Sequence, residues 1–366
     1  MQTRSSSETA LKMAIAVFMA VFLSFAAHHA HAKDKGAQGP ELVVYTYDSF
    51  VGKEGLGPIL QAAYEKKTGE KLRFVTVGDA GQLLARIQLD SERRKNKAFM
   101  EGANVVLGID QNLEPKLKDY LVPIDRAREG AFMKFVDREW WLGEAFVPFD
   151  YGVFAFIADT KKLPPADFPK KWTDLLKWKY RKSLLLEDPR TSSPGMAFLL
   201  GSLAVTGDGF KDYWKDLRSQ WKVLAPGWTQ AYSLFIREEA PLVWSYVTSE
   251  AYHRTTCKKD NCSTPDRYHA VIFQEGHPVQ IEGAAILKDA PGGAKMRKRS
   301  LEFLELLTSE QIQTEIPEHQ WMMPVRLGIK LPPIFQSLPV VAKKFPPEMD
   351  AEKLDSALSL WNQAIR

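Results

Sequence analysis

The order of strand-like and helix-like segments constrains this fold more than any other feature of the sequence. Residues 41–47 are predicted as a buried strand, residues 57–67 as an amphipathic helix and residues 72–77 as a second strand. A helical pattern starts near Gly81, and ANVVLG at 103–108 is predicted as a third strand. Such alternation is typical of parallel βαβ units, so it predicts an α/β sheet with helices on both faces.

The same alternation returns in the second half of the chain. A strand at 184–186 precedes a helix that should begin at Pro194, and residues 241–247 are a further strand. Extended segments at 146–159 and 271–287 connect the halves. We therefore predict two α/β lobes, each a mostly parallel sheet flanked by helices, joined by two hinge crossovers. The predicted ranges are 38–148 for the first part of lobe 1, 149–275 for lobe 2, and 276–366 for the return to lobe 1 and the C-terminal helices.

Polar side chains gather at the carboxyl ends of the predicted strands. VVYTYDSF at 43–50 begins with two β-branched valines and ends with hydroxyl groups and a carboxylate. Ligands of open α/β sheets bind beyond the carboxyl ends of the strands. We therefore predict a ligand cleft between the lobes. The strand ends that would form it are Tyr45–Ser49, Gly78–Asp79, Asp110, Asp188–Ser193 and Tyr246–Ser249.

Residues 1–32 have the features of a secretory signal peptide. Arg4 and Lys12 precede the apolar run MAIAVFMAVFLSFAA, and AHA at 30–32 is a small-x-small cleavage pattern. An uncleaved membrane anchor is the alternative, but the run is shorter than the roughly 18 apolar residues that a span needs. We expect cleavage after Ala32, which leaves 334 of the 366 residues as an exported, soluble protein.

The charge balance argues against nucleic acid or an anionic membrane as a partner. The chain has 49 basic and 45 acidic residues and a net charge of +4. Removal of residues 1–32 takes away Arg4, Lys12 and Glu8 and lowers that charge by one, to +3. A chain so close to neutral creates no strong attractive field for polyanions.

Cys257 and Cys262 are the two cysteines of the sequence, and four residues separate them. In an oxidising compartment we expect them to form a local disulfide that closes a surface loop. A zinc site is the alternative, but it would need more ligands than the nearby His253 and His269 supply.

The stretch Thr191-Ser192-Ser193-Pro194-Gly195 has the composition of a helix start. Ser193 is well placed to cap a helix whose first residue is Pro194, because the N–H that proline lacks has no partner at that position. Hydroxyl groups and free N–H groups at a helix N-terminus suit a phosphate or another anion. A simple N-cap without any ligand explains the same residues, and the motif alone does not exclude it.

Aromatic side chains recur at predicted junctions between loops and elements. Their faces hold flat cations by stacking and cation–π attraction, each contact contributing about 0.5–2 kcal/mol. A single ring is more often part of the core, but several at such junctions favour a binding site. Asp79 and Asp48 are candidate hydrogen-bond acceptors or countercharges beside them. The candidate aromatic residues are Trp228, Tyr232, Tyr246, Tyr252 and Trp321.

Seven motifs, taken in order, closely resemble the periplasmic thiamine-binding proteins of bacterial ABC importers. The resemblance extends from about Leu42 to the C-terminus, and it implies a type II periplasmic binding-protein fold that closes on its ligand. It also implies a monomer in the periplasm without cofactors, which delivers thiamine, thiamine monophosphate or thiamine diphosphate to a membrane permease. The motifs are YTYDSF at 45–50, VVLGIDQNL at 105–113, FVPFDYG at 146–152, EDPRTSSPG at 187–195, PGWTQAYSLF at 226–235, SYVTSEAYH at 245–253 and WMMPV at 321–325.

The resemblance also implies a role for individual residues. Asp79 would bind the exocyclic amine of the aminopyrimidine, with Tyr47 beside it. The hydroxyethyl or phosphate end would meet Thr191, Ser192 and Ser193. The rings that would stack around the ligand are Trp228, Tyr246, Tyr252 and Trp321.

This chain departs from the family pattern just after YTYDSF. The family carries an aromatic residue there, whereas residues 51–55 read VGKEG. One wall of the stacking site is therefore absent or is supplied from elsewhere in the chain. Lys53 and Glu54 would then alter the preference among the phosphorylated forms.

Three other readings use the same architecture. A secreted thiaminase-like enzyme would need a reactive cysteine, for which Cys257 and Cys262 are the candidates. A ferric-ion receptor would need clustered tyrosines, and no adjacent pair occurs in the sequence. A polyamine receptor would need several carboxylates with aromatic rings and is harder to exclude.

The expected mechanism is hinge closure. A ligand that contacts both lobes stabilises the closed form and shifts a pre-existing equilibrium towards it. The crossovers at Asp150-Tyr151-Gly152 and Gln274-Glu275-Gly276 are the predicted hinges.

Overall fold

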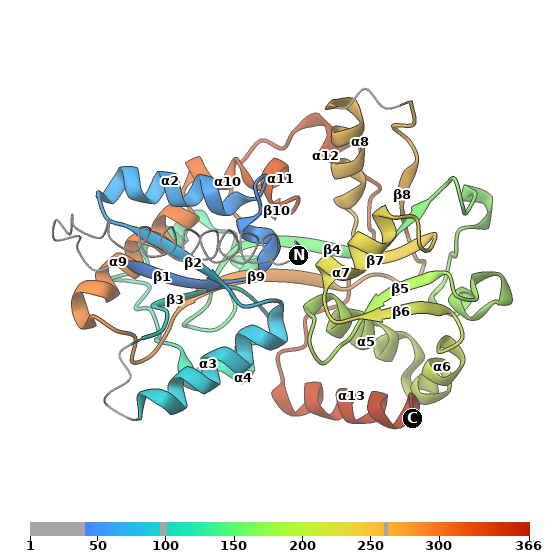
Figure 1. The fold of residues 1–366 in the computed structure, drawn as a ribbon, viewed down its shortest axis with the longest axis horizontal. Coiled ribbons are helices and arrows are strands. Elements are labelled where there is room, and N and C mark those ends of the chain that lie inside the picture. Colours follow the sequence, from blue (N-terminus) through green and yellow to red (C-terminus); the bar gives the residue numbers. More distant parts are fainter. Residues whose placement is uncertain (1–40, 96–100, 260–262) are drawn as a thin grey trace, which may run out of the picture. The chain divides into compact units, whose positions relative to one another are not determined.

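A computed structural model describes residues 41–95, 101–259 and 263–366 (Figure 1). The predicted signal peptide, residues 1–32, lies outside the described residues. The strands are β1 (Leu42–Thr46), β2 (Leu72–Thr76), β3 (Val105–Asp110), β4 (Val147–Asp159), β5 (Leu184–Glu187), β6 (Trp221–Ala225), β7 (Leu242–Tyr246), β8 (Tyr268–Val271), β9 (Val279–Ile286) and β10 (Met323–Pro324). The α-helices are α2 (Leu56–Thr68), α3 (Ala80–Arg94), α4 (Glu114–Leu117), α5 (Ser193–Thr206), α6 (Phe210–Leu217), α7 (Trp228–Ile236), α8 (Ser249–Lys259), α9 (Gly293–Leu307), α10 (Glu310–Gln313), α11 (Ile316–His319), α12 (Pro333–Gln336) and α13 (Ala351–Ala364).

Local sequence signals set the ends of the first helices. Helix α2 ends where Gly69 adopts a left-handed conformation, with φ of 70°, and donates its N–H to the carbonyl of Glu65. Helix α3 begins with a capping box: the Asp79 side chain accepts backbone N–H groups of the first turn, and the Asp79 N–H donates to the side-chain oxygen of Gln82. The capping box determines where helix α3 begins after strand β2, and it holds the Asp79 carboxylate at that junction.

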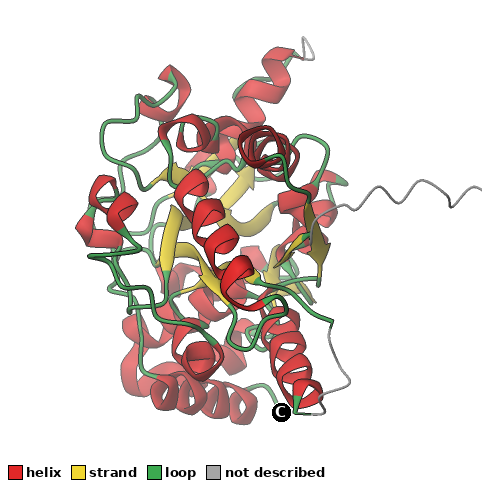
Figure 2. Cartoon of the chain, turned by 90° about the vertical axis from the view of Figure 1, so that its left-hand side faces the viewer, coloured by secondary structure: helices red, strands yellow, loops and turns green. Residues whose placement is uncertain are grey.

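The strands form a mixed sheet with a parallel group at each end. The order is β2-β1-β3-β9-β4-β7-β5-β6, and β8 and β10 both pair with β4. Strand β1 runs parallel to β2 and β3, and β5 runs parallel to β6 and β7. Strands β9 and β4 between the two groups are antiparallel to their neighbours. Figure 2 shows helices on both sides of the strands, as the βαβ pattern predicts.

Strand β4 belongs to both halves of the sheet. Residues Val147–Val153 pair with β9, whereas Phe154–Ala158 pair with β7. The other predicted crossover, 271–287, is not one extended segment, because β8 ends at Val271 and β9 begins only at Val279. The predicted hinge at Gln274–Gly276 lies in the intervening turn, where Gly276 has a φ of 117°. That a glycine occupies this left-handed position explains why the strand is interrupted there.

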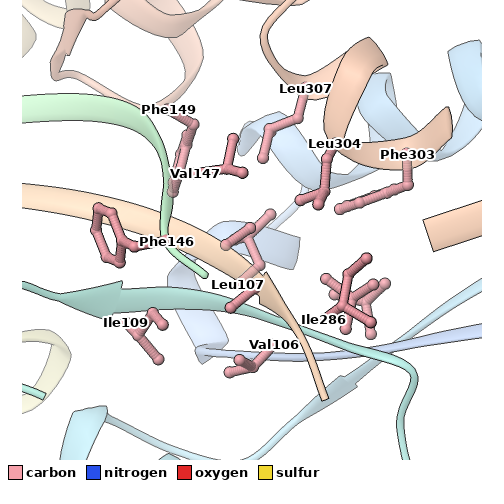
Figure 3. Close-up of a cluster of buried hydrophobic side chains, with 14 of the residues drawn as sticks. Val106, Leu107, Ile109, Phe146, Val147, Phe149, Ile286, Phe303, Leu304 and Leu307 are labelled. Carbon is pink, nitrogen blue, oxygen red and sulfur yellow. The ribbon is translucent and has the colours of Figure 1, made fainter. Parts of the chain in front are cut away.

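Separate hydrophobic clusters define the two lobes. We call β1, β2, β3, α2, α3 and α9 lobe 1, and β5, β6, β7, α5, α6 and α7 lobe 2. In lobe 1, Phe149 of β4 lies in one buried cluster with Leu304 and Leu307 of α9 (Figure 3). In lobe 2, the buried rings of Trp214 and Trp244 belong to a second cluster. A third cluster, which includes Phe235 of α7, also lies in lobe 2. Separate cores in each lobe, with shared strands between them, are the packing that a two-lobe α/β protein requires.

The last helix packs on lobe 2. Helix α13 lies against α6 and α5 (Figure 1), and its Trp361 meets Trp214 edge to face with 5.8 Å between the ring centres. The prediction described residues 276–366 as a return to lobe 1 followed by C-terminal helices. Strand β9 and helix α9 do pack with lobe 1, and α13 then completes the core of lobe 2. The chain therefore passes between the lobes a third time after α9.

Candidate functional site

A pocket of about 690 Å³ opens at the carboxyl ends of the parallel strands, between the two lobes. Tyr47 and Asp79 line it from lobe 1, Trp228 and Tyr246 line it from lobe 2, and Glu282 lines it from β9. This is the place where the polar strand ends predicted a cleft. Volumes of about 300–1,000 Å³ are usual for small-molecule sites.

The structure gathers eight of the ten predicted site residues around this pocket. Thr191 and Ser192 do not line it, and of the predicted strand ends Asp110 and Asp188 also stay outside. The gathered residues are Tyr47, Asp79, Ser193, Trp228, Tyr232, Tyr246, Tyr252 and Trp321. Their roles in binding a ligand stay predictions.

Asp79 links the two lobes. Its Oδ1 accepts the N–H of Ala80 at 2.7 Å, which is the cap of α3, and its Oδ2 accepts the N–H of Trp228 at 3.2 Å. A second contact lies beside it, where the N–H of Gly81 donates to the carbonyl of Thr191 at 3.0 Å. Burial raises the pKa of Asp79, and the two backbone hydrogen bonds oppose that rise. Asp79 is therefore both a wall of the pocket and part of the contact that holds lobe 1 against lobe 2.

The aromatic residues form two groups at the pocket. Trp228 stacks on Tyr232 with 4.6 Å between the ring centres, and the Trp228 indole N–H donates to Ser245 at 2.9 Å. Tyr252 and Trp321 meet edge to face at 5.2 Å. One face of the Trp228 ring is therefore already covered by Tyr232, so a stacked ligand would meet the other face.

Trp321 has an unusual backbone. Its backbone φ angle is 57°, in the left-handed region that residues other than glycine rarely adopt. Its N–H donates to the carbonyl of Ile316, so the turn that follows α11 holds this conformation. Strained residues of this kind are concentrated at functional sites, and Trp321 lines the pocket.

The start of α5 differs from its prediction. The helix begins at Ser193 and its N-cap is Ser192, whose side chain makes no capping hydrogen bond, so the predicted cap at Ser193 was wrong by one residue. The Thr191 hydroxyl donates a hydrogen bond to the Pro226 carbonyl at 2.7 Å. The predicted contact of these residues with a phosphate stays a prediction.

Carboxyl groups surround the start of α5. Asp110 is buried, accepts the N–H groups of Asn112 and Leu113 at 2.9 Å each, and interacts with the Ser193 hydroxyl. Glu187 is also buried, and neither of its carboxylate oxygens has a hydrogen-bond partner in the described part of the chain. Burial raises the pKa of both groups, and the charge of Asp79 adds to the rise at Glu187. The burial that raises these pKa values also disfavours an incoming anion, which opposes the effect of the helix N-terminus.

A hydrogen-bonded network on β9 was missed by the sequence analysis. Glu282 accepts the Tyr47 hydroxyl at 2.8 Å and the Gln280 amide at 2.6 Å, and Gln280 in turn accepts the Tyr246 hydroxyl at 2.8 Å. Gln320 donates to the Tyr47 hydroxyl and, at 3.4 Å, to Glu282. The signal was present in VQIEGAAI, where Gln280 and Glu282 share one face of an otherwise apolar strand.

Asp150 on β4 faces this network. It pairs in register with Glu282 across the antiparallel strands, so both side chains lie on the same face of the sheet. Asp150 is fully buried, and neither of its carboxylate oxygens accepts a hydrogen bond within the described residues. Burial and the charge of Glu282 raise the pKa of Asp150 well above its ordinary value, and burial raises the pKa of Glu282 to about 7.

Cys257 of α8 is disulfide-bonded, whereas Cys262, its predicted partner, lies outside the described residues. Within residues 41–95, 101–259 and 263–366, no three His, Cys, Asp or Glu side chains are grouped so that they could hold a metal ion. Across those same ranges, no helix has both the length and the apolar character of a membrane span.

Solved structures share this fold. A structure described as a periplasmic thiamin binding protein superposes with a TM-score of 0.77 at 33% sequence identity, over 89% of this chain and 96% of that one. A ferric binding protein from Campylobacter jejuni superposes with a TM-score of 0.71 over 88% of this chain and 99% of its own, but at 14% identity it shows the fold alone. The fold and the pocket between the lobes define a two-lobe periplasmic binding protein of type II.

Proteins related in sequence identify the family within the two-lobe binding proteins. Residues 110–348 match the family described as bacterial extracellular solute-binding protein. The thiamine-binding periplasmic protein of Salmonella typhimurium strain LT2 is 36% identical over 330 residues, which cover 89% of this chain and 94% of that protein. The chain belongs to the family of thiamine-binding periplasmic proteins, which confirms the resemblance drawn from its motifs.

Proposed function

We propose that this protein is a periplasmic receptor that captures thiamine between its lobes and delivers it to the permease of an ABC importer. The observation that carries the proposal is one pocket lined by aromatic rings from lobe 2 and by carboxyl groups from lobe 1 and β9. Relatives named as thiamine-binding proteins over nearly the whole chain support it.

The chemistry of thiamine matches the pocket. Its thiazolium ring carries a permanent positive charge, which aromatic faces and carboxylates both attract. Its aminopyrimidine is flat and has hydrogen-bonding groups, for which Asp79 offers acceptor oxygens at one wall of the pocket. Tyr47 and Glu282 supply further polar groups at the same site.

Closure of the lobes is the proposed mechanism of capture. Asp79 contacts Trp228, and Gly81 contacts Thr191, so backbone atoms of both lobes meet at the edge of the pocket. A ligand that adds contacts to both walls shifts the equilibrium towards this closed form. Strand β4, which pairs with both halves of the sheet, is the element about which we expect the lobes to move.

Unesterified thiamine is the form that we expect to bind at least as tightly as its phosphates. Asp79, Asp110 and Glu187 lie around the start of α5, where the sequence predicted a phosphate site. Burial raises the pKa of each, and the same buried surroundings disfavour the negative charge of a phosphate. Arg237 also lines the pocket and is the guanidinium that a phosphate ester would use.

A binding protein fits the structure better than an enzyme. A thiaminase-like mechanism requires a cysteine thiolate as nucleophile. Cys257 is disulfide-bonded and does not line the pocket. We therefore propose that the protein does not alter the ligand that it carries.

A polyamine receptor is the second candidate, because buried carboxyl groups beside aromatic rings would also suit an extended polycation. Calorimetric titration of the refolded, ligand-stripped protein with thiamine, its monophosphate, its diphosphate and spermidine separates the two. Tight one-to-one binding of thiamine supports the proposal. Binding of spermidine without binding of thiamine overturns it, and a clear preference for the phosphates overturns the expected order.

A further inference from the structure

One carboxyl group lines the pocket and a second lies directly behind it, where one positive charge is expected to bind. Glu282 lines the pocket, and Asp150 lies behind it at the paired position of the neighbouring strand. Directly opposed positions on antiparallel strands bring Cβ atoms to about 5 Å. Two carboxylates this close and this buried cannot both ionise without a compensating cation, since the low-dielectric surroundings strengthen their repulsion.

The hydrogen bonds of the two carboxyl groups are unequal. Glu282 accepts hydrogen bonds from Tyr47 and from Gln280, which stabilise its ionised form. Asp150 accepts none from the described residues, so nothing there stabilises its charge. The proton of the pair therefore resides preferentially on Asp150, and Glu282 is the group whose charge can respond to a ligand.

The groups around the pair supply little positive charge. Acidic and phenolic groups face it from several elements: Tyr47 after β1, Asp79 at α3, Asp110 at the end of β3, and Tyr246 at the end of β7. Glu187 of β5 interacts with the same Tyr246. The other titratable or charged residues that line the pocket are Asp48, Glu54, Tyr232, Arg237, Tyr252 and His319.

We propose that Asp150 and Glu282 form a proton-sharing pair that selects a cationic ligand, with Glu282 ionising as its countercharge when the cation binds. This inference rests on the proposed function, because the cation is the thiazolium ring of thiamine. The proton that Glu282 gives up passes to the solvent, and Asp150 keeps its own. Binding is therefore coupled to the release of a proton, and an uncharged analogue of the ligand gains nothing from it.

The coupling has a size that titration can measure. For a group that titrates near pH 7 when empty and stays ionised in the complex, about half a proton is released at pH 7, and affinity rises about tenfold between pH 6 and pH 8. The number of protons follows from binding heats measured in two buffers that differ in their ionisation enthalpy. Titration of thiamine itself contributes equally to every variant and cancels in the comparison.

Two isosteric variants should change the pH dependence in different ways. Glu282→Gln removes the countercharge, so thiamine should bind at least tenfold more weakly at pH 8 and without the rise between pH 6 and pH 8. Burial and the charges of Asp110 and Asp79 raise the pKa of Glu282, whereas the protonated Asp150 lowers it by interacting with the ionised form. Asp150→Asn replaces that acidic proton with a weaker N–H donor, so Glu282 should ionise at higher pH and the rise in affinity should shift to higher pH. Glu305→Gln, at an ion pair with Lys67 on the surface of lobe 1, is the matched control and should keep the tenfold rise.

Each result has a distinct meaning. If the unaltered protein and the Glu305→Gln control bind thiamine with no proton release, the inference is wrong and the proposed function stands. If Asp150→Asn leaves the pH of the rise unchanged, Asp150 does not stabilise ionised Glu282 and the inference is equally wrong. If neither the unaltered protein nor the Glu305→Gln control binds thiamine at any pH, the proposed function is wrong, and so is this inference. Should Glu282→Gln not fold, the Asp150→Asn comparison alone decides.

Discussion

Gly81 offers a test of closure that leaves the lining of the pocket untouched. It lies in the first turn of α3, and a Cβ added there would come within 2.8 Å of the Cα of Thr191 and within about 3.0 Å of the Arg190 carbonyl, both backbone atoms of lobe 2. Backbone cannot move aside as a flexible side chain can, so the lobes of a Gly81→Ala protein should stay apart by a few tenths of an ångström or more.

The expected loss can be worked out from two hydrogen bonds. Separation weakens the bond from the Gly81 N–H to the Thr191 carbonyl and the bond from the Trp228 N–H to the Asp79 carboxylate. A neutral hydrogen bond contributes about 1 kcal/mol and one to a charged group about 1.5–3 kcal/mol. Their loss from the closed form predicts thiamine binding that is weaker by about 2.5–4 kcal/mol, or roughly 70- to 800-fold.

Stability and affinity should respond separately in this variant. Alanine is favoured over glycine within a helix by up to about 1 kcal/mol, so the unliganded Gly81→Ala protein should melt no lower than the parent. Gly209→Ala is the matched control, because a Cβ at Gly209 meets no atom within 4 Å. Calorimetry with thiamine and thermal melts without it measure both quantities. Affinity within twofold of the parent would refute closure through this contact.

Three further perturbations have expected outcomes. Trp228→Ala should weaken thiamine binding at least tenfold, about 1.4 kcal/mol, if the free face of that ring stacks on the ligand, whereas Trp178→Ala, at a residue 75% exposed, should not change the titration. Asp150→Asn should raise the melting temperature of the unliganded protein at pH 8 more than at pH 5. The sign follows because a carboxyl group whose pKa is raised on folding stabilises the fold below its unfolded pKa, and this stability is lost as the pH rises through the folded pKa. Trp361→Ala should lower the free energy of unfolding by about 3–5 kcal/mol in denaturant titrations, because the ring is fully buried, and an effect under 1 kcal/mol would contradict the packing of α13 on lobe 2.

Short-range patterns carried most of the fold prediction. The first strand, predicted at 41–47, spans Leu42–Thr46, and the helix predicted at 57–67 spans Leu56–Thr68. Both depend on periodicity and on caps that act within a few residues. The antiparallel place of β9 between β3 and β4 depends on partners more than 100 residues away, and no local pattern specifies such pairing. The packing of the C-terminal helix α13 on lobe 2 was not predicted for the same reason.

The site shows the same limit. The polar residues at the strand ends correctly predicted that Tyr47, Asp79 and Tyr246 line the pocket, because the carboxyl ends of parallel strands share one edge of the sheet. At the junction of the lobes, the Thr191 carbonyl accepts the Gly81 N–H and the Thr191 hydroxyl donates to the Pro226 carbonyl, whereas its predicted contact with a ligand stays a prediction. Glu282 lies inside a strand, where a sequence offers no sign of what faces it until the register with Asp150 is known.

The position of α13 has a consequence for how the chain is made. Lobe 2 contributes Trp214 to its core about 150 residues before Trp361, which covers it, has been synthesised. Protein chains emerge from the ribosome N-terminus first, so an unfinished chain exposes the large apolar surface that Trp361 and Leu354 later bury. A chain that stops before Ala351 would carry this exposed surface permanently, and chaperones and proteases recognise such surfaces. The exposed core of lobe 2 would therefore be the feature that separates a truncated copy from a finished one.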